Sequence, residues 1–150
     1  ALNKWDLMSV NRGDSQSHIE RLRDRFPFLA NYPIVYMSAL TGKRVSKCLE
    51  AVAASFDAFT MRVPTAQLNK TVGDAAARLP LSREGKDVRL LYATQNRVGP
   101  PLFVVFSNRP DLLPESYKRY VEGCLREEFG FHGTPLKILW RRRARAASPR

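Results

Sequence analysis

Cysteine and histidine are scarce in this chain of 150 residues, which has two of each. Cys48 and Cys124 fall on or beside apolar helical patterns, so we expect buried free thiols and neither a disulfide nor a metal site. His18 and His132 have no ligand-like spacing and are interpreted as ordinary surface or loop residues. The sequence also lacks an apolar run of about 18 residues and a signal-peptide pattern, so we expect a cytoplasmic protein with no membrane partner.

The motifs that handle nucleotide phosphates are missing as well. No G-x-x-x-x-G-K-S/T loop occurs, and no Asp-x-x-Gly element precedes the motifs described below. In P-loop nucleotide hydrolases these elements hold the phosphates and magnesium. We therefore expect the chain, as it stands, neither to hold nor to hydrolyse a nucleotide well, and we assign it no catalytic or metal-binding residue.

Acidic residues are few relative to basic ones, 14 against 25, and the formal net charge is +11. Residues 1–62 contain nine Lys or Arg and six Asp or Glu, whereas residues 63–150 contain sixteen and eight. Pro64 can end one helix and Thr65 can cap the next. We therefore place a domain junction at about residue 63, with the more basic domain after it.

Two short motifs, present in this order, form the pair that P-loop GTPases use to recognise guanine: N-K-W-D at Asn3–Asp6 and S-A-L-T-G at Ser38–Gly42. The Asp6 carboxylate can accept the N1–H and the N2 amino group of guanine in one bidentate contact. Adenine lacks this donor pair and would leave the carboxylate unpaired, so specificity rests chiefly on Asp6. Each motif alone is common by chance; it is their joint occurrence, each between an apolar strand and a helical pattern, that indicates a site.

The other motif residues have supporting roles in this interpretation. The Asn3 amide serves the opposite base edge and holds neighbouring loops, and the backbone N–H of Ala39 donates to guanine O6. The Lys4 stem and the Trp5 ring cover the base with apolar surface. The predicted guanine-binding residues are Asn3, Lys4, Asp6, Ser38, Ala39 and Leu40.

Apolar spacing around the motifs predicts the last third of a doubly wound α/β domain. Residues 33–37 are predicted to form a buried strand. The helices before and after it should bury Ile19, Leu22 and Phe26 in the first and Val45, Leu49, Val52, Phe56 and Phe59 in the second. The two residues before Asn3 are too few for the strand that should deliver this motif, so we expect the chain to be the C-terminal piece of a longer protein.

The second half predicts a compact α+β unit in the order α-β-β-α-β. A helix runs from Thr65 to Pro80, and Gly130 caps a long helix that starts near Pro114. The predicted loop covers residues 81–87, and the predicted strands cover residues 88–92, 102–106 and 136–140.

Several motifs of this half resemble the C-terminal KH-like domain of the Der (EngA) ribosome biogenesis GTPases. They are Thr94-Gln95, Pro100-Pro101-x-Phe103, Ser107-Asn108-x-Pro110, Tyr117-Lys118-Arg119-Tyr120, Leu125-Arg126 and Phe129-Gly130-Phe131-x-Gly133-Thr134-Pro135. The resemblance implies two consecutive GTPase domains followed by this one. Residues 1–62 would then close the second GTPase domain, residues 63–142 would be the KH-like domain, and residues 143–150 a basic tail that we expect to be disordered when free.

The same resemblance implies GTP-dependent assembly of the large ribosomal subunit in the bacterial cytoplasm. GTP or GDP with Mg²⁺ would be bound by the intact parent and not held tightly by this fragment. The implied partners are guanine nucleotide, the large ribosomal subunit or its rRNA, and the missing upstream GTPase domains.

Gly130–Gly133 has the G-x-x-G form of the loop with which ordinary KH domains clamp a nucleic-acid backbone. That clamp joins two helices, whereas here a helix leads into a strand, so we favour a cap and turn. RNA contact is then expected from charge, with Arg126 extending the basic patch. The predicted RNA-binding residues are Arg141, Arg142, Arg143, Arg145, Lys118 and Arg119. A solubilising tail and a merely solvated helix face are the alternatives.

Two functions are left open by the sequence. One is a fragment of a GTP-hydrolysing assembly factor, and the other is a stand-alone RNA-binding or protein-docking module with a vestigial GTPase segment. If the first holds, residues 1–62 lack most of a sheet and should expose apolar faces, whereas residues 63–150 should melt cooperatively alone.

Overall fold

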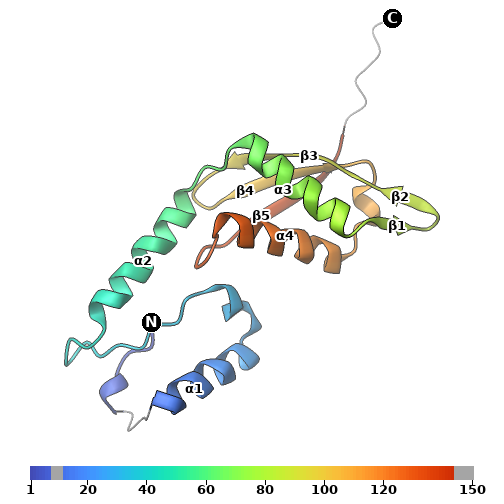
Figure 1. Cartoon of the computed structure of the whole chain (residues 1–150). Helices are drawn as coiled ribbons and strands as arrows, with labels where there is room; N and C mark the ends of the chain where they lie inside the picture. Colours follow the sequence, from blue (N-terminus) through green and yellow to red (C-terminus); the bar gives the residue numbers. More distant parts are fainter. Residues whose placement is uncertain (8–11, 144–150) are drawn as a thin grey trace, which may run out of the picture. The chain divides into compact units, whose positions relative to one another are not determined.

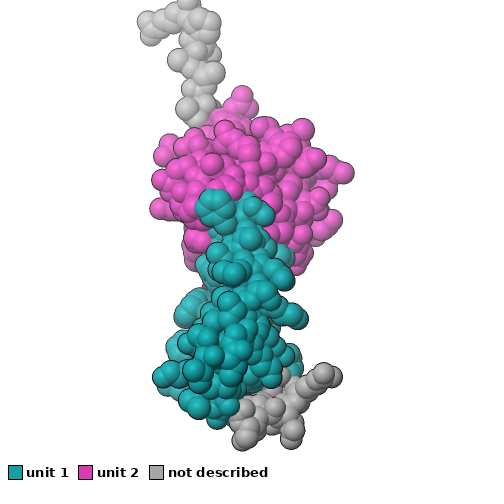
Figure 2. Space-filling model, turned by 90° about the vertical axis from the view of Figure 1, so that its left-hand side faces the viewer, with its two compact units in different colours: residues 1–58, 132–134 teal, residues 59–131, 135–150 magenta. Residues whose placement is uncertain are grey.

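The computed structural model describes residues 1–7 and 12–143 of the chain, and Arg145 and Arg150 of the predicted tail lie outside these ranges. The chain divides into two compact units, residues 1–58 with 132–134 and residues 59–131 with 135–150, which Figure 2 shows in two colours. The boundary between the units at residues 58 and 59 lies a few residues before the junction expected near residue 63. The assignment of these units as domains stays a prediction.

Unit 1 contains both of the helices predicted around the motifs. They are α1 (Arg12–Arg25) and α2 (Val45–Thr60) (Figure 1). Two short 3-10 turns are also present: η1 (Trp5–Leu7) contains the last two residues of the first motif, and η2 (Pro27–Asn31) follows α1. The two helices are therefore confirmed in position, but Phe26, expected to be buried in the first, lies just past the end of α1 and is 40% exposed.

The prediction that residues 33–37 form a strand is wrong. Only an isolated parallel bridge between Leu2 and Tyr36 is present among the described residues of this segment. The Leu2 N–H donates to Val35 O at 2.8 Å, and the Met37 N–H donates to Leu2 O at 2.9 Å. A strand is extended by the ladder it forms with neighbours, and here Leu2 supplies a single step of such a ladder.

The apolar stripe of α2 is also not the core that its spacing predicted. Leu49, Val52 and Phe56 are 64%, 60% and 62% exposed, and Val45 and Phe59 are partly buried. The expectation that this half would expose apolar faces is thus confirmed. Periodicity identifies which face of a helix is apolar, but it does not supply the layer that would cover that face.

Unit 2 has the predicted α-β-β-α-β order with a β-hairpin and a 3-10 turn added. Its elements are α3 (Thr65–Arg78), β1 (Leu81–Arg83), β2 (Lys86–Val88), β3 (Leu90–Arg97), β4 (Leu102–Ser107), η3 (Pro110–Leu112), α4 (Glu115–Phe129) and β5 (Lys137–Arg142). The segment expected to be a loop is the hairpin β1-β2, which pairs Leu81 with Val88. Its tip, Glu84-Gly85, has φ of 53° and 67°, the left-handed pair that a tight two-residue hairpin turn requires.

The main sheet has the order β3-β4-β5. β3 is antiparallel to β4, and β5 is parallel to β4, so α4 provides the crossover that parallel neighbours need. α3 and α4 lie on the same side of this sheet (Figure 1). Phe103 and Val105 of β4 are fully buried, as are Leu68 of α3 and Leu125 of α4.

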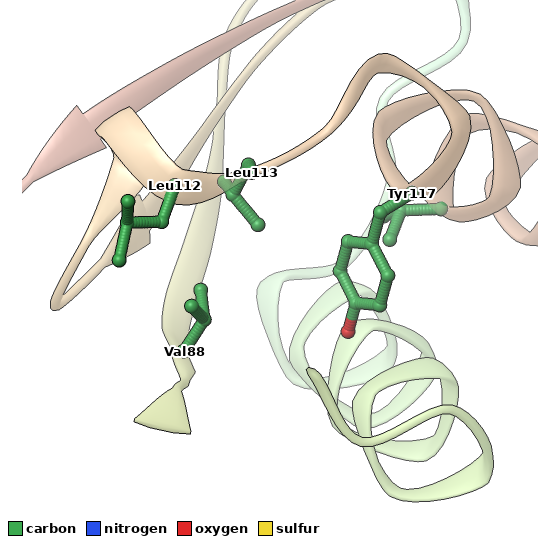
Figure 3. Close-up of a cluster of buried hydrophobic side chains, with 5 residues drawn as sticks. Val88, Leu112, Leu113 and Tyr117 are labelled. Carbon is green, nitrogen blue, oxygen red and sulfur yellow. The ribbon is translucent and has the colours of Figure 1, made fainter. Parts of the chain in front are cut away.

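A second part of the core of unit 2 lies where the hairpin approaches α4. Val88, Leu112, Leu113 and Tyr117 form a buried cluster with Val121 (Figure 3). Burial raises the pKa of the Tyr117 phenol, because an apolar surrounding disfavours the charged form. The cluster fixes η3 and the hairpin against the start of α4.

Cys48 and Cys124 are free and partly buried, less enclosed than expected. No helix in the described ranges is both long and apolar enough to cross a membrane.

Candidate base-binding site and basic surface

The two predicted recognition loops lie against each other in unit 1. The Asn3 Oδ1 atom accepts a hydrogen bond from the Ala39 backbone N–H at 3.0 Å. The Ser38 hydroxyl donates a short hydrogen bond to Asp6 Oδ1. Two hydrogen bonds therefore join the motifs, and each bond has one partner from each motif. The two motifs lie side by side in the fold, as the sequence predicted.

The backbone of both loops explains why Ser38 can orient Asp6. Ser38 is fully buried, and its hydroxyl also accepts from the Thr41 N–H at 3.2 Å. Its own N–H donates to Lys43 O at 3.0 Å, which closes the second loop. Lys4 has φ of 62°, a left-handed conformation uncommon outside glycine that turns the chain between Asn3 and Asp6.

The predicted guanine-binding residues other than Ser38 are exposed to solvent. Leu40 is 87% exposed, and the remaining exposed members are Asn3, Lys4, Asp6 and Ala39. The Ala39 N–H, predicted to donate to guanine O6, donates to Asn3 in this structure. An ionised carboxylate has about four lone-pair sites, so the bond from Ser38 orients Asp6 and leaves acceptor capacity for a base.

The Trp5 ring has a different position from the one expected. Its centroid lies 3.9 Å from that of Tyr36 and 6.3 Å from that of His18, so it packs inside unit 1, whereas the sequence interpretation had it covering the base. Tyr36 is 4% exposed, and burial raises the pKa of its phenol. Sequence reasoning missed Tyr36 and His18 as supports of the loop; the one available signal was an aromatic residue within the apolar run before the second motif.

The predicted RNA-binding residues fall into two groups. Arg142 is paired with Asp111 at 2.8 Å and Lys118 with Glu115 at 2.7 Å. These hydrogen bonds hold the pKa values of Asp111 and Glu115 below their ordinary range. The remaining described members, which are exposed and have no ion pair assigned to them, are Arg119, Arg141 and Arg143.

Arg126 is not part of the basic surface that it was expected to extend. Only 8% of it is exposed, and its guanidinium pairs with Glu122 at 2.8 Å and donates to Phe131 O at 2.7 Å. Gly130 has φ of 69° and ends α4, and Phe131 is fully buried. The cap-and-turn interpretation of the G-x-x-G sequence is confirmed, because its second residue lies in the core.

Residues 62–141 match a sequence family described as the KH-domain-like region of EngA bacterial GTPase enzymes, C-terminal. The chain is 42% identical over 150 residues to "GTPase Der" of Thermomicrobium roseum, covering 98% of this chain and 33% of the relative. It is 42% identical over 142 residues to "GTPase Der" of Moorella thermoacetica, covering 94% and 32%. The chain thus spans about a third of the length of these curated relatives. Among solved structures, a variant of Aquifex aeolicus Era bound to GDP·AlF4⁻ matches with a TM-score of 0.31 and 15% identity, over 93% of this chain and 54% of that one.

Proposed function

This chain belongs to the family of the C-terminal, KH-domain-like region of EngA bacterial GTPases, and from that premise we propose that it supplies guanine recognition and RNA contact to a GTP-hydrolysing factor that assembles the large ribosomal subunit. The observation that carries the proposal is the pair of hydrogen bonds that join Asn3 to Ala39 and Ser38 to Asp6. They hold a carboxylate and an amide at one exposed edge of unit 1.

The polar groups at this edge fit a guanine base. The Asp6 carboxylate is an acceptor-only group matched to the two adjacent donors of guanine. The Asn3 amide carries donors that Ala39 does not use, and these suit an acceptor on the base. Asp6 and Asn3 would hold the base, and the Ala39 N–H holds Asn3 in place. The phosphates of GTP and Mg²⁺ would be bound by parts of the relatives beyond the third that this chain spans, and we assign GTP hydrolysis to those parts.

The second part of the proposal is RNA contact by the basic unit 2. Sixteen of the 25 basic residues lie in residues 63–150, against eight acidic ones. Exposed cations release condensed counterions when they bind phosphates, which makes the affinity fall steeply with salt. Arg119, Arg141 and Arg143 are the exposed candidates for such contacts.

Two titrations of the isotopically labelled chain test the proposal. Guanosine at millimolar concentration should shift the amide resonances of residues 3–6 and 38–42, and adenosine should not. Ribosomal RNA should bind with an affinity whose logarithm falls linearly with the logarithm of the salt concentration. The substitutions Arg141→Gln and Arg143→Gln should make that slope less steep. Equal responses to both nucleosides would contradict base recognition, and a flat salt dependence would contradict phosphate contact. RNA binding without any guanosine response would favour a stand-alone RNA-binding module.

A further inference from the structure

The main sheet of unit 2 has two faces of different character. In β4, Phe103 and Val105 point to the helix side and are fully buried, whereas Phe106 between Val105 and Ser107 is only partly buried. Successive residues of a strand point to opposite faces, and residues paired across strands share a face. The face opposite α3 and α4, called here the open face, therefore consists of three rows of paired residues: Tyr92, Phe106 and Arg141; Thr94, Val104 and Leu139; and Arg97, Leu102 and Lys137.

The first row places two aromatic rings beside an arginine. The rings of Tyr92 and Phe106 are stacked, with centroids 4.3 Å apart and planes inclined by 15°. Arg141 pairs with Phe106 from the other side, in β5. Tyr92 lies in β3, an edge strand of this sheet. Within residues 1–7 and 12–143 no further strand pairs with β3 on that side, so a planar group can continue the stack there.

The charges of the open face all have one sign. Arg97, Lys137 and Arg141 are exposed at its two ends, and none of its nine residues is acidic. The row between them consists of Thr94, Val104 and Leu139; Val104 is buried, at 7% exposed, and its two neighbours are partly exposed. Cations at both ends of an aromatic and apolar surface match a flexible polyanion that carries planar apolar groups.

We propose that the open face binds single-stranded RNA, with a base stacked on the Tyr92–Phe106 pair and phosphates held by Arg97, Lys137 and Arg141. The inference rests on the proposed RNA contact. It adds which surface of unit 2 binds the RNA and that the bound RNA is single-stranded. Aromatic platforms bind single strands because unpaired bases present their faces, whereas a duplex hides them. Arg119 and Arg143, the other exposed candidates for phosphate contact, are not among the nine residues of this face.

The test uses the whole chain and a short labelled oligoribonucleotide, offered as a single strand and as a hairpin duplex, with binding followed by fluorescence anisotropy. Tyr92→Leu and Phe106→Leu keep apolar volume and remove the ring. Each should weaken single-strand binding by about tenfold or more, as expected for loss of base stacking, with the salt slope unchanged. Arg97→Gln and Lys137→Gln should each lower the slope by about 0.7. Phe28→Leu and Lys86→Gln are controls at exposed positions off the open face and should bind like the parent.

The outcomes separate this inference from the broader proposal. If both ring variants bind RNA with the affinity of the parent chain, the open-face site is overturned. Weaker binding by Arg119→Gln and Arg143→Gln would then show that RNA contact itself still holds, through other residues. Binding of no RNA by the parent chain would overturn both and point to a protein partner for this face. If a ring variant fails to fold by circular dichroism, photo-crosslinking of 4-thiouridine RNA to the parent chain decides: adducts on Tyr92 or Phe106 support the site, and adducts confined to other residues overturn it.

Discussion

Arg126 should contribute more to the stability of unit 2 than any exposed basic residue of α4. Its guanidinium, 8% exposed, donates to Glu122 Oε1 at 2.9 Å through Nε and to Phe131 O at 2.7 Å through a terminal nitrogen. Arg126→Met keeps most of the apolar stem and removes every one of these donors. The backbone carbonyl of the fully buried Phe131 would then have lost its charged partner.

The size of the effect follows from two costs. A buried carbonyl left unsatisfied costs about 1–3 kcal/mol. Breaking a fully buried ion pair costs about 3–5 kcal/mol, but the Glu122 side chain is 33% exposed and can regain water, so its share is smaller. We therefore expect a loss of about 3 kcal/mol. For a domain of this size, each kcal/mol lowers Tm by about 4–8 °C, so a loss of about 3 kcal/mol lowers Tm by roughly 12–24 °C.

Thermal and urea unfolding of the whole chain, followed by circular dichroism, measure this loss. Arg119→Met is the matched control, because Arg119 is an exposed residue of the same helix, and its effect should stay within about 0.5 kcal/mol. Glu122→Gln should fall between the two, since it keeps an acceptor and removes the charge. An Arg126→Met variant as stable as Arg119→Met would refute the assignment of Arg126 to the core.

Three further predictions concern the base site, an ion pair and a helix end. Asp6→Asn replaces an acceptor with an amide donor, so NMR shifts caused by guanosine should be lost, and xanthosine, which has a carbonyl at C2, should bind in its place; retained guanosine shifts would contradict the role of Asp6. The hydrogen bond from Arg142 holds the pKa of Asp111 below its ordinary value, so its stabilisation is present above the unfolded pKa and lost as pH falls through the folded one; Arg142→Gln should raise this pKa in an NMR titration, and an unmoved pKa would exclude the pair in solution. Gly130→Ala meets no atom within 4 Å but must adopt φ of 69°, so urea unfolding should show a loss of about 1 kcal/mol, whereas Gly123→Ala, in the helix interior with the same free space, should gain about 0.5–1 kcal/mol.

Local patterns predicted the elements whose signal lies within one segment. The helices α3 and α4 and the cap at Gly130 follow from apolar spacing and one glycine, and the adjacency of Asp6 and Ser38 follows from the two motifs. The hairpin β1-β2 was missed because its strands are three residues each and carry Arg83 and Lys86, which gives no apolar alternation.

Other features depend on partners that a sequence pattern does not name. The 33–37 segment has strand composition, but a strand needs a ladder, and Leu2 provides one bridge. The α2 stripe has core composition, but Leu49 and Val52 are mostly exposed. Arg126 was grouped with exposed cations because its burial depends on the turn at Phe131, whose ring packs against Phe103 of β4.

The run of arginines at the C-terminal end shows how the fold divides a charge cluster that looks uniform in sequence. Residues 137–142 form β5, so its side chains alternate between faces. Arg141 pairs with Phe106 in the open face, whereas Arg142 pairs with Ser107 in register and binds Asp111 at 2.8 Å. The two neighbouring arginines thus differ: Arg141 lies on the face that we propose binds RNA, whereas Arg142 forms an ion pair within unit 2. Deleting the run as a block would therefore mix a lost contact with a damaged sheet edge, and only single substitutions can tell the two apart.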